Sequence, residues 1–205
     1  MAKHLAAKGR DMRTRLAIEA AKLIAEEGIK DFLIAKRKAA ERLGVAEHTS
    51  SFPNNLEIEA SLIEYQRLFK SGTAGLRLRA LREAAKQAML LFEDFYPRLV
   101  GSVLSGNATE FSDVELHLFD DAPEKVAMHL MSREIPYQSG ERRVRQSGGE
   151  FQRIPLFGFI AGDIGIETVV FPYKDMHCAP ACPVNGKPMR RASLEELELL
   201  LLAEA

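Results

Sequence analysis

The sequence lacks several features that would place a protein in an obvious class. It has only two cysteines in 205 residues, so it has no disulfide framework. Its formal net charge of −1 at pH 7 creates no overall field that would draw it to nucleic acid or to an anionic membrane. Its longest apolar runs, such as residues 199–203, are far too short to cross a bilayer, and the N-terminus has no apolar core of signal-peptide length. We therefore expect a cytoplasmic protein with no membrane partner.

The remaining composition is that of a soluble globular protein, with 46% hydrophobic and 28% charged residues. No internal repeat or low-complexity tract interrupts it. Apolar residues recur at helical spacing up to residue 95, whereas short strand-like runs appear beyond Pro97, such as the β-branched run over residues 164–171. We therefore expect two domains, a helical region over residues 1–95 and a mixed α/β region over residues 96–205.

Local signals set the expected elements of each domain. Glycines follow two of the periodic segments and indicate helix ends, while Ser193 and Glu196 have the spacing of a capping box. The run between residues 47 and 55 consists of turn-forming residues. We expect helices over residues 13–28, 33–43, 56–69, 76–95 and 123–132 and from residue 193, with strands over residues 98–102, 114–119, 136–144, 151–159 and 164–171.

The most informative segment lies between residues 101 and 116. Gly101 and Ser102 follow a short apolar run, and after a spacer of ten residues come Asp113 and Glu115, with one apolar residue between them. Side chains alternate along a strand, so both carboxylates point to the same face. Hard divalent cations such as Mg²⁺ bind to carboxylates of this kind together with substrate phosphates. Gly101 lets a phosphate approach the backbone, and Ser102 offers hydrogen-bond donors to it.

A third carboxylate is expected from a neighbouring strand. Glu167 interrupts a β-branched run over residues 164–171, where an acidic side chain is costly unless it is solvated or paired. Asp163 is the alternative, but the sequence around Gly162 is typical of a hairpin turn, in which aspartate is common for structural reasons. We favour Glu167.

This segment resembles the nucleotidyltransferase superfamily of the DNA polymerase β type, in its minimal form and as found in bacteria. The resemblance rests on Val100-Gly101-Ser102 and on Ser112-Asp113-Val114-Glu115-Leu116, with the spacing that the family uses. It implies an α+β fold, in which an N-terminal helical region precedes a mixed β-sheet palm with helices on one face. It also implies that Asp113, Glu115 and Glu167 bind two Mg²⁺ ions and are the catalytic residues, Glu167 helping to deprotonate the acceptor hydroxyl.

The implied reaction transfers a nucleoside monophosphate from a nucleoside triphosphate to a hydroxyl acceptor, which is a small molecule, an RNA or a protein. Two departures from the family pattern favour a catalytically inactive regulator as the alternative. The second carboxylate is Glu115 where aspartate is commoner, and Leu104-Ser105 stands where the family usually has Ala-Arg, so a basic residue is missing at Ser105. A ligand displaced by one methylene matters, because errors of about 1 Å cost roughly a hundredfold in rate.

Other polar residues are weaker candidates. Arg143 and Arg145 share one face of a predicted strand, and we assign them to nucleotide binding together with Gly101 and Ser102. His117 shares the face of the carboxylates but is more often a satisfied polar residue in such a position, and Lys174 is a further candidate for phosphate binding. His177, Cys178 and Cys182 lack a fourth zinc ligand at a usual spacing, so a loop with two reduced thiols is the simpler interpretation.

The helical region offers one further hypothesis. Residues 15–45 resemble the opening helices of TetR-type repressors, and residues 1–50 carry eleven Lys or Arg against seven Asp or Glu, a net charge of +4. Lys36, Arg37 and Lys38 fit a face that contacts phosphates, so nucleic acid is a candidate partner of this region. They fit a solvated helix face equally well, and the turn-forming residues after residue 46 stand where the repressor needs its recognition helix.

Overall fold

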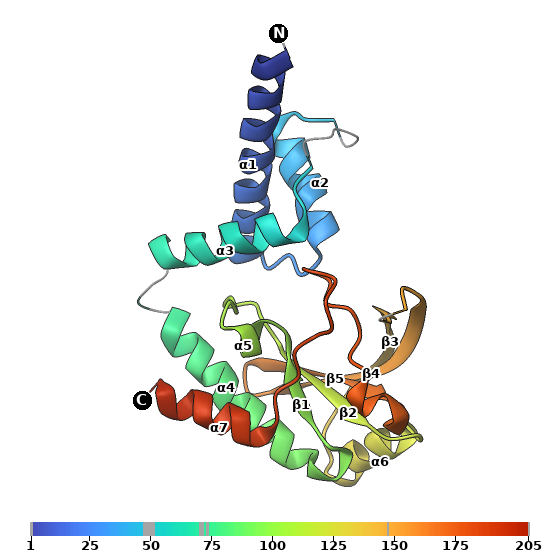
Figure 1. Cartoon of the computed structure of the whole chain (residues 1–205). Helices are drawn as coiled ribbons and strands as arrows, with labels where there is room; N and C mark the ends of the chain where they lie inside the picture. The colour runs from blue at the N-terminus through green and yellow to red at the C-terminus, as the bar shows by residue number, and fades with distance from the viewer. Residues whose placement is uncertain (1, 47–51, 70–71, 73, 147, 205) are drawn as a thin grey trace. The chain divides into compact units, whose positions relative to one another are not determined.

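A computed structural model describes residues 2–46, 52–69, 72, 74–146 and 148–204 (Figure 1). The fold class is α+β, as predicted, with N-terminal helices followed by a five-stranded mixed sheet. The chain divides into two compact units. The first comprises Met1–Gly75 with Thr109–Phe111 and Pro183–Asn185, and the second comprises Leu76–Ala108, Ser112–Cys182 and Gly186–Ala205. Among the described residues, no helix combines the length and apolar character needed to cross a membrane.

The first unit is built from α1 (Ala2–Glu27), α2 (Phe32–Leu43) and α3 (Asn55–Phe69). In Figure 1, α2 lies beside α1 and α3 crosses the C-terminal part of α1. The helix expected over residues 13–28 begins much earlier, at Ala2, in a segment rich in alanine, the best helix former. The two helix ends predicted from glycines are confirmed, and Gly44 adopts a left-handed conformation with φ of 65°. The predicted loop over residues 47–55 lies partly outside the described residues.

The core of the first unit is small and rich in alanine. Close-packed alanines on α1 and α2 surround larger aliphatic side chains, and Ile58 and Leu62 of α3 close the cluster. Alanine side chains let helix axes approach closely, which any small helical bundle exploits. The core therefore explains the alanine-rich sequence without requiring a DNA-binding role.

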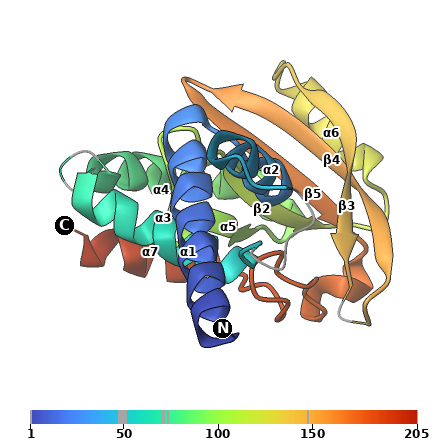
Figure 2. The same ribbon diagram turned by 90° about the horizontal axis from the view of Figure 1, so that it is seen from above.

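The second unit contains α4 (Ala74–Leu91), η1 (Glu93–Phe95), β1 (Arg98–Val100), α5 (Gly101–Ser105), β2 (Val114–Phe119), α6 (Glu124–Ser132), β3 (Gln138–Arg145), β4 (Phe151–Ala161), β5 (Ile164–Phe171), η2 (Tyr173–His177) and α7 (Leu194–Ala203). The strand order is β1-β2-β5-β4-β3. Strands β2 and β5 run parallel, and every other pair is antiparallel. Figure 2 shows the long β4 beside β5, with β3 at the edge.

One face of the sheet is covered by helices. Apolar side chains of α4, α6 and α7 pack on alternate residues of β2 and β5, such as Val114 and Ile166, in the largest core of the molecule. Helix α4 therefore contributes its buried face to the sheet unit, whereas the sequence analysis grouped it with the helical region. Its periodicity revealed an amphipathic helix, but periodicity does not show which core an apolar face joins.

The opposite face of the sheet has a smaller apolar cluster and a polar end. Phe119, Ile154, Val169 and Phe171 form this cluster, and Met176 of η2 packs against it. On the same face, Glu115 of β2 and Glu167 of β5 are acidic rather than apolar. The candidate site lies at this acidic end.

Candidate active site

The sheet register brings two of the three predicted carboxylates together. Glu115 and Glu167 are direct partners in the parallel β2–β5 pair, at the centre of the sheet. Neighbouring strands lie about 4.8 Å apart, so the two side chains leave the same face as near neighbours. Asp163, the alternative third carboxylate, lies in the turn between β4 and β5, where it is exposed and pairs with Arg77 at 2.9 Å. The structure thus places Glu167, and not Asp163, beside Glu115.

The third acidic residue, Asp113, lies one alternation before Glu115 and against the backbone of Gly165. A Cβ atom at Gly165 would stand only 2.3 Å from Oδ1 and 2.8 Å from Cγ of Asp113. Gly165 precedes Glu167 by the same interval by which Asp113 precedes Glu115, so all these positions share one face. The absence of a side chain at Gly165 makes the space that the Asp113 carboxylate occupies.

A second glycine makes room for Glu115. Gly101 directly follows β1 and has φ of +73°, a conformation that other residues rarely adopt. A Cβ atom there would lie 3.3 Å from both Cδ and Oε1 of Glu115. The predicted strand over residues 98–102 is therefore wrong at its end, because the backbone turns at Gly101 into the short helix α5. In this helix, Ser102 shares a hydrogen bond of 3.3 Å with the hydroxyl of Ser112.

Sequence reasoning missed the cation that lies between the carboxylates. Arg142 of β3 donates from Nη1 to Oε2 of Glu115 at 2.9 Å, and its Nη2 donates to Oε2 of Glu167. Arg143 and Arg145, the predicted nucleotide-binding residues, occupy the other face of β3 by strand alternation. The Arg143 guanidinium stacks on the Phe151 ring, 3.9 Å from its centroid. The prediction started from two arginines that share a face, but only the register of four strands, β2, β5, β4 and β3, shows which face of β3 lies on the side of the acids.

Burial and the neighbouring charges have opposing effects on the pKa values of this cluster. Burial raises the pKa of Glu115, with the neighbouring Glu167 and Asp113 adding to the rise and Arg142 opposing it. Burial acts to lower the pKa of Arg142, but the attraction of the Glu115 and Glu167 carboxylates outweighs it and the pKa is raised. About a third of each side chain remains exposed, at 34% for Glu115, 29% for Glu167 and 31% for Arg142. Small ions can therefore reach the cluster from solvent.

The donor chemistry of the site fits a hard divalent cation, since all three acidic side chains offer carboxylate oxygens from one face. The arrangement differs from that of a preformed metal centre. Within the described ranges, no group of three or more His, Cys, Asp or Glu side chains is placed to ligate one ion. A cation bridging Glu115 and Glu167 would take the place that the Arg142 guanidinium holds. Arg142 holds Oε2 of Glu115 and of Glu167, so a cation bound through these atoms would have to displace it.

His117 is a structural residue, as the simpler interpretation predicted. Its side chain is buried, its Nδ1 accepts a hydrogen bond of 3.0 Å from Nε of Arg191, and its ring lies 4.5 Å from that of Phe171. Burial, reinforced by the positive charge of Arg191, lowers the pKa of His117 to about 3. The same arginine donates from Nη1 to the backbone carbonyls of Asp175 and Met176 and so fixes η2 to the sheet. The neutral imidazole thus serves as an acceptor.

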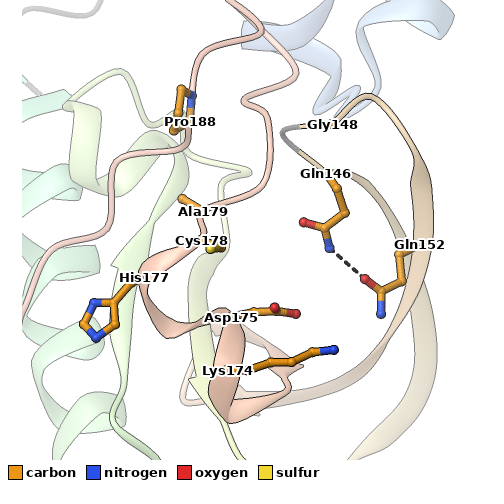
Figure 3. A pocket seen from close by; sticks show the side chains of 9 residues that line it. All are labelled: Gln146, Gly148, Gln152, Lys174, Asp175, His177, Cys178, Ala179 and Pro188. Carbon is orange, nitrogen blue, oxygen red and sulfur yellow. Dashed lines mark hydrogen bonds between the residues drawn. The ribbon is translucent and has the colours of Figure 1, made fainter.

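A pocket of about 530 Å³ lies between η2 and the β3–β4 hairpin (Figure 3). Lys174 and Asp175 point toward the side chains of Gln146 and Gln152, which share a hydrogen bond of 2.7 Å. Lys174 lines this pocket, so the structure places it beside a space for ligand rather than beside the carboxylates. Cys178 also lines it, and both Cys178 and Cys182 are free thiols, as the loop interpretation predicted.

The basic segment of the first unit is engaged in ion pairs. Lys38 bonds Glu27 of α1 at 3.1 Å, and Arg42 bonds both Glu19 at 3.0 Å and Glu27. These pairs tie α2 to α1. They also neutralise part of the positive charge on which the nucleic-acid hypothesis depended.

Comparison with known proteins finds a distant structural neighbour. The sequence matches no protein-family model and no curated protein sequence. A chain in a solved structure described as the GLD-2/RNP-8 complex is similar to this chain at 17% identity with a TM-score of 0.33. The similarity covers 57% of this chain and 48% of that one, so the present chain spans about half of the neighbour's length. A TM-score at this level does not establish a shared function, which must be argued from the site itself.

Proposed function

We propose that this chain is a metal-dependent nucleotidyltransferase that transfers a nucleoside monophosphate from a nucleoside triphosphate to a hydroxyl acceptor. One observation carries the proposal, namely that Glu115 and Glu167 stand in register on one face of the sheet while glycines clear the space beside Glu115 and Asp113. Three acidic side chains at one end of a sheet are costly unless a cation holds them together. The resemblance of residues 100–116 to the polymerase β-type family supports the same reading.

Each residue of the site has a proposed role. Asp113, Glu115 and Glu167 would hold two Mg²⁺ ions, which, when bound, neutralise the triphosphate charge and lower the pKa of the acceptor hydroxyl. Gly101 and Ser102 would bind the phosphates, since the open backbone at Gly101 lies directly against Glu115. Glu167 would accept the proton of the acceptor hydroxyl. Charge and positioning supply most of the acceleration in reactions of this class.

A second candidate function is a catalytically silent regulator of the same fold, whose helical unit binds nucleic acid or a protein partner. The ion pairs of Arg142 favour it, because a guanidinium that satisfies Glu115 and Glu167 serves as a permanent counter-ion in a site without metal. The two candidates differ in whether the acidic cluster turns over a triphosphate.

Transfer of label from each of the four α-³²P-labelled ribonucleoside triphosphates distinguishes the candidates. The protein would be incubated with Mg²⁺ and RNA, small-molecule or protein acceptors. An enzyme incorporates label, and Glu167→Gln lowers incorporation by about a hundredfold or more, as loss of a positioned general base does. Glu141→Gln is the matched control, because Glu141 is an exposed acid on the edge strand β3 that pairs with Arg153. Equal incorporation by both variants, or thermal stabilisation by nucleotides without any transfer, contradicts the enzymatic proposal.

A further inference from the structure

Arg142 holds the position that a bridging cation would take in the acidic cluster. We propose that Arg142 and a divalent cation compete for Glu115 and Glu167, and that the triphosphate of the nucleotide resolves the competition by binding the released guanidinium. This inference rests on the proposed function and deepens it. Arg142 is then a positioning residue that couples uptake of the cation to uptake of the nucleotide.

The contacts of Arg142 support competition rather than coexistence. Nη1 and Nη2 of one planar guanidinium each donate to an Oε2 atom, one on Glu115 and one on Glu167. A cation held through the same Oε2 atoms would have to displace the guanidinium. Arginine forms such two-pronged contacts with particular strength, so the guanidinium is an effective rival.

The charge of the displaced Arg142 is the reason for including the triphosphate in the proposal. Without Arg142 or a metal, Glu115 and Glu167 would face each other as like charges across one strand pair. If a divalent cation displaces Arg142, the half-buried guanidinium loses both partners, and a partly desolvated charge without a partner is unfavourable. A triphosphate offers it a new anion of suitable geometry. The cation alone therefore binds weakly, and the cation together with triphosphate binds well.

The test is Mn²⁺ binding by the full-length protein, measured by calorimetry and electron paramagnetic resonance. Mn²⁺ alone is compared with the preformed complex of Mn²⁺ and tripolyphosphate, which carries no base and so does not depend on nucleotide identity. The variants are Arg142→Gln, Arg142→Lys, which keeps the charge but loses the two-pronged contact, and Arg153→Gln. The last is the matched control, because Arg153 lies on β4 with its side chain 78% exposed and pairs with Glu141.

Competition predicts that Arg142→Gln binds Mn²⁺ alone about tenfold to a hundredfold more tightly than the wild type, within the usual range of coupling between two ligands. The preference of the wild type for Mn²⁺-tripolyphosphate over Mn²⁺ should largely disappear in this variant. Arg142→Lys should be intermediate, and Arg153→Gln should match the wild type. If Arg142→Gln folds poorly, Mn²⁺ should raise its melting temperature more than that of the wild type, and Arg142→Lys supplies the binding data.

Two results overturn the inference and are distinguishable. If Arg142→Gln binds Mn²⁺ no more tightly than the wild type, or keeps the full preference for Mn²⁺-tripolyphosphate, the coupling is wrong. The proposed function survives that result provided that Glu115→Gln abolishes binding of Mn²⁺-tripolyphosphate. If neither the wild type nor Arg142→Gln binds Mn²⁺ in either form, the inference and the metal-dependent function both fail.

Discussion

Replacement of Gly165 by alanine tests whether the position of Asp113 matters to the site. The new Cβ atom would stand 2.3 Å from Oδ1 of Asp113, and ordinary van der Waals contact begins near 3.4 Å. The carboxylate must therefore withdraw by the difference, 3.4 minus 2.3, or about 1.1 Å. The obstructing atoms belong to the end of a short side chain that can rotate, so the backbone of β5 need not move.

Function and stability should consequently separate in Gly165→Ala. Overpacking that a rotating side chain relieves costs at most about 1 kcal/mol, at the low end of the usual range. A displacement of about 1 Å in a ligand or catalytic group can cost on the order of a hundredfold in rate. We therefore expect a urea midpoint close to that of the wild type, together with a hundredfold loss of nucleotidyl transfer. Affinity for Mn²⁺-tripolyphosphate should fall in parallel.

Gly140→Ala provides the matched control. Gly140 lies in β3, its nearest neighbour to an added Cβ is Leu156 Cδ2 at 3.9 Å, and its backbone conformation suits alanine. This variant should be as active as the wild type and more stable by about 0.5 kcal/mol, since alanine reduces the entropy of the unfolded chain. If Gly165→Ala and Gly140→Ala have the same activity, Asp113 has no role that depends on its position. If Gly165→Ala unfolds, the Asp113 side chain does not rotate away from the new Cβ atom, and the reasoning is wrong.

Three further predictions concern stability. Between pH 6.5 and pH 5 the free energy of unfolding should fall by about 2 kcal/mol, as measured by urea titrations at each pH. The pKa of His117 is lowered to about 3, so this residue stays neutral in the folded protein but takes up a proton when the chain unfolds. His117→Gln should make the free energy of unfolding less dependent on pH over this range. Arg82→Met should lower the free energy of unfolding by about 2–3 kcal/mol in the same assay, because the buried Arg82 donates to the Val103 carbonyl at 3.2 Å and pairs with Glu204. A decrease below about 0.5 kcal/mol would contradict this. Ser193→Ala removes the capping box of α7 and should lower the melting temperature by the equivalent of about 1 kcal/mol, with Ser139→Ala in β3 as the neutral comparison.

Much of the second unit could be predicted because its signals are local. The strands 114–119 and 164–171 have the bounds that their β-branched and apolar residues indicate. The capping box at Ser193 and the turn at Gly162 are equally local, since each depends on residues within one turn of chain. Three acidic positions on one face also followed from alternation along two strands, once those strands were assumed to be neighbours.

The features that could not be predicted depend on register between distant strands. Arg142 and Arg143 are adjacent in sequence, and only the alignment of β3 on β4, β4 on β5 and β5 on β2 decides which of them shares a face with Glu115. A slip of one residue at any of these pairings would exchange the two arginines. The turn at Gly101 was missed for a similar reason, because the left-handed backbone there and the close approach of Glu115 from β2 both arise from the fold.

The two glycines of the site bear on why its acidic residues are there. Glycine within a strand lowers stability by about 0.5–1 kcal/mol relative to alanine, so Gly165 weakens β5 at a central position of the sheet. Any side chain at Gly165 would displace the Asp113 carboxylate from its place beside the strand that bears Glu167. We therefore propose that the glycine at this position serves the placement of Asp113 rather than the stability of the strand. About one-third of each of the Glu115, Glu167 and Arg142 side chains is exposed, so under the proposed function the metal and the nucleotide would enter the acidic end of the sheet from solvent.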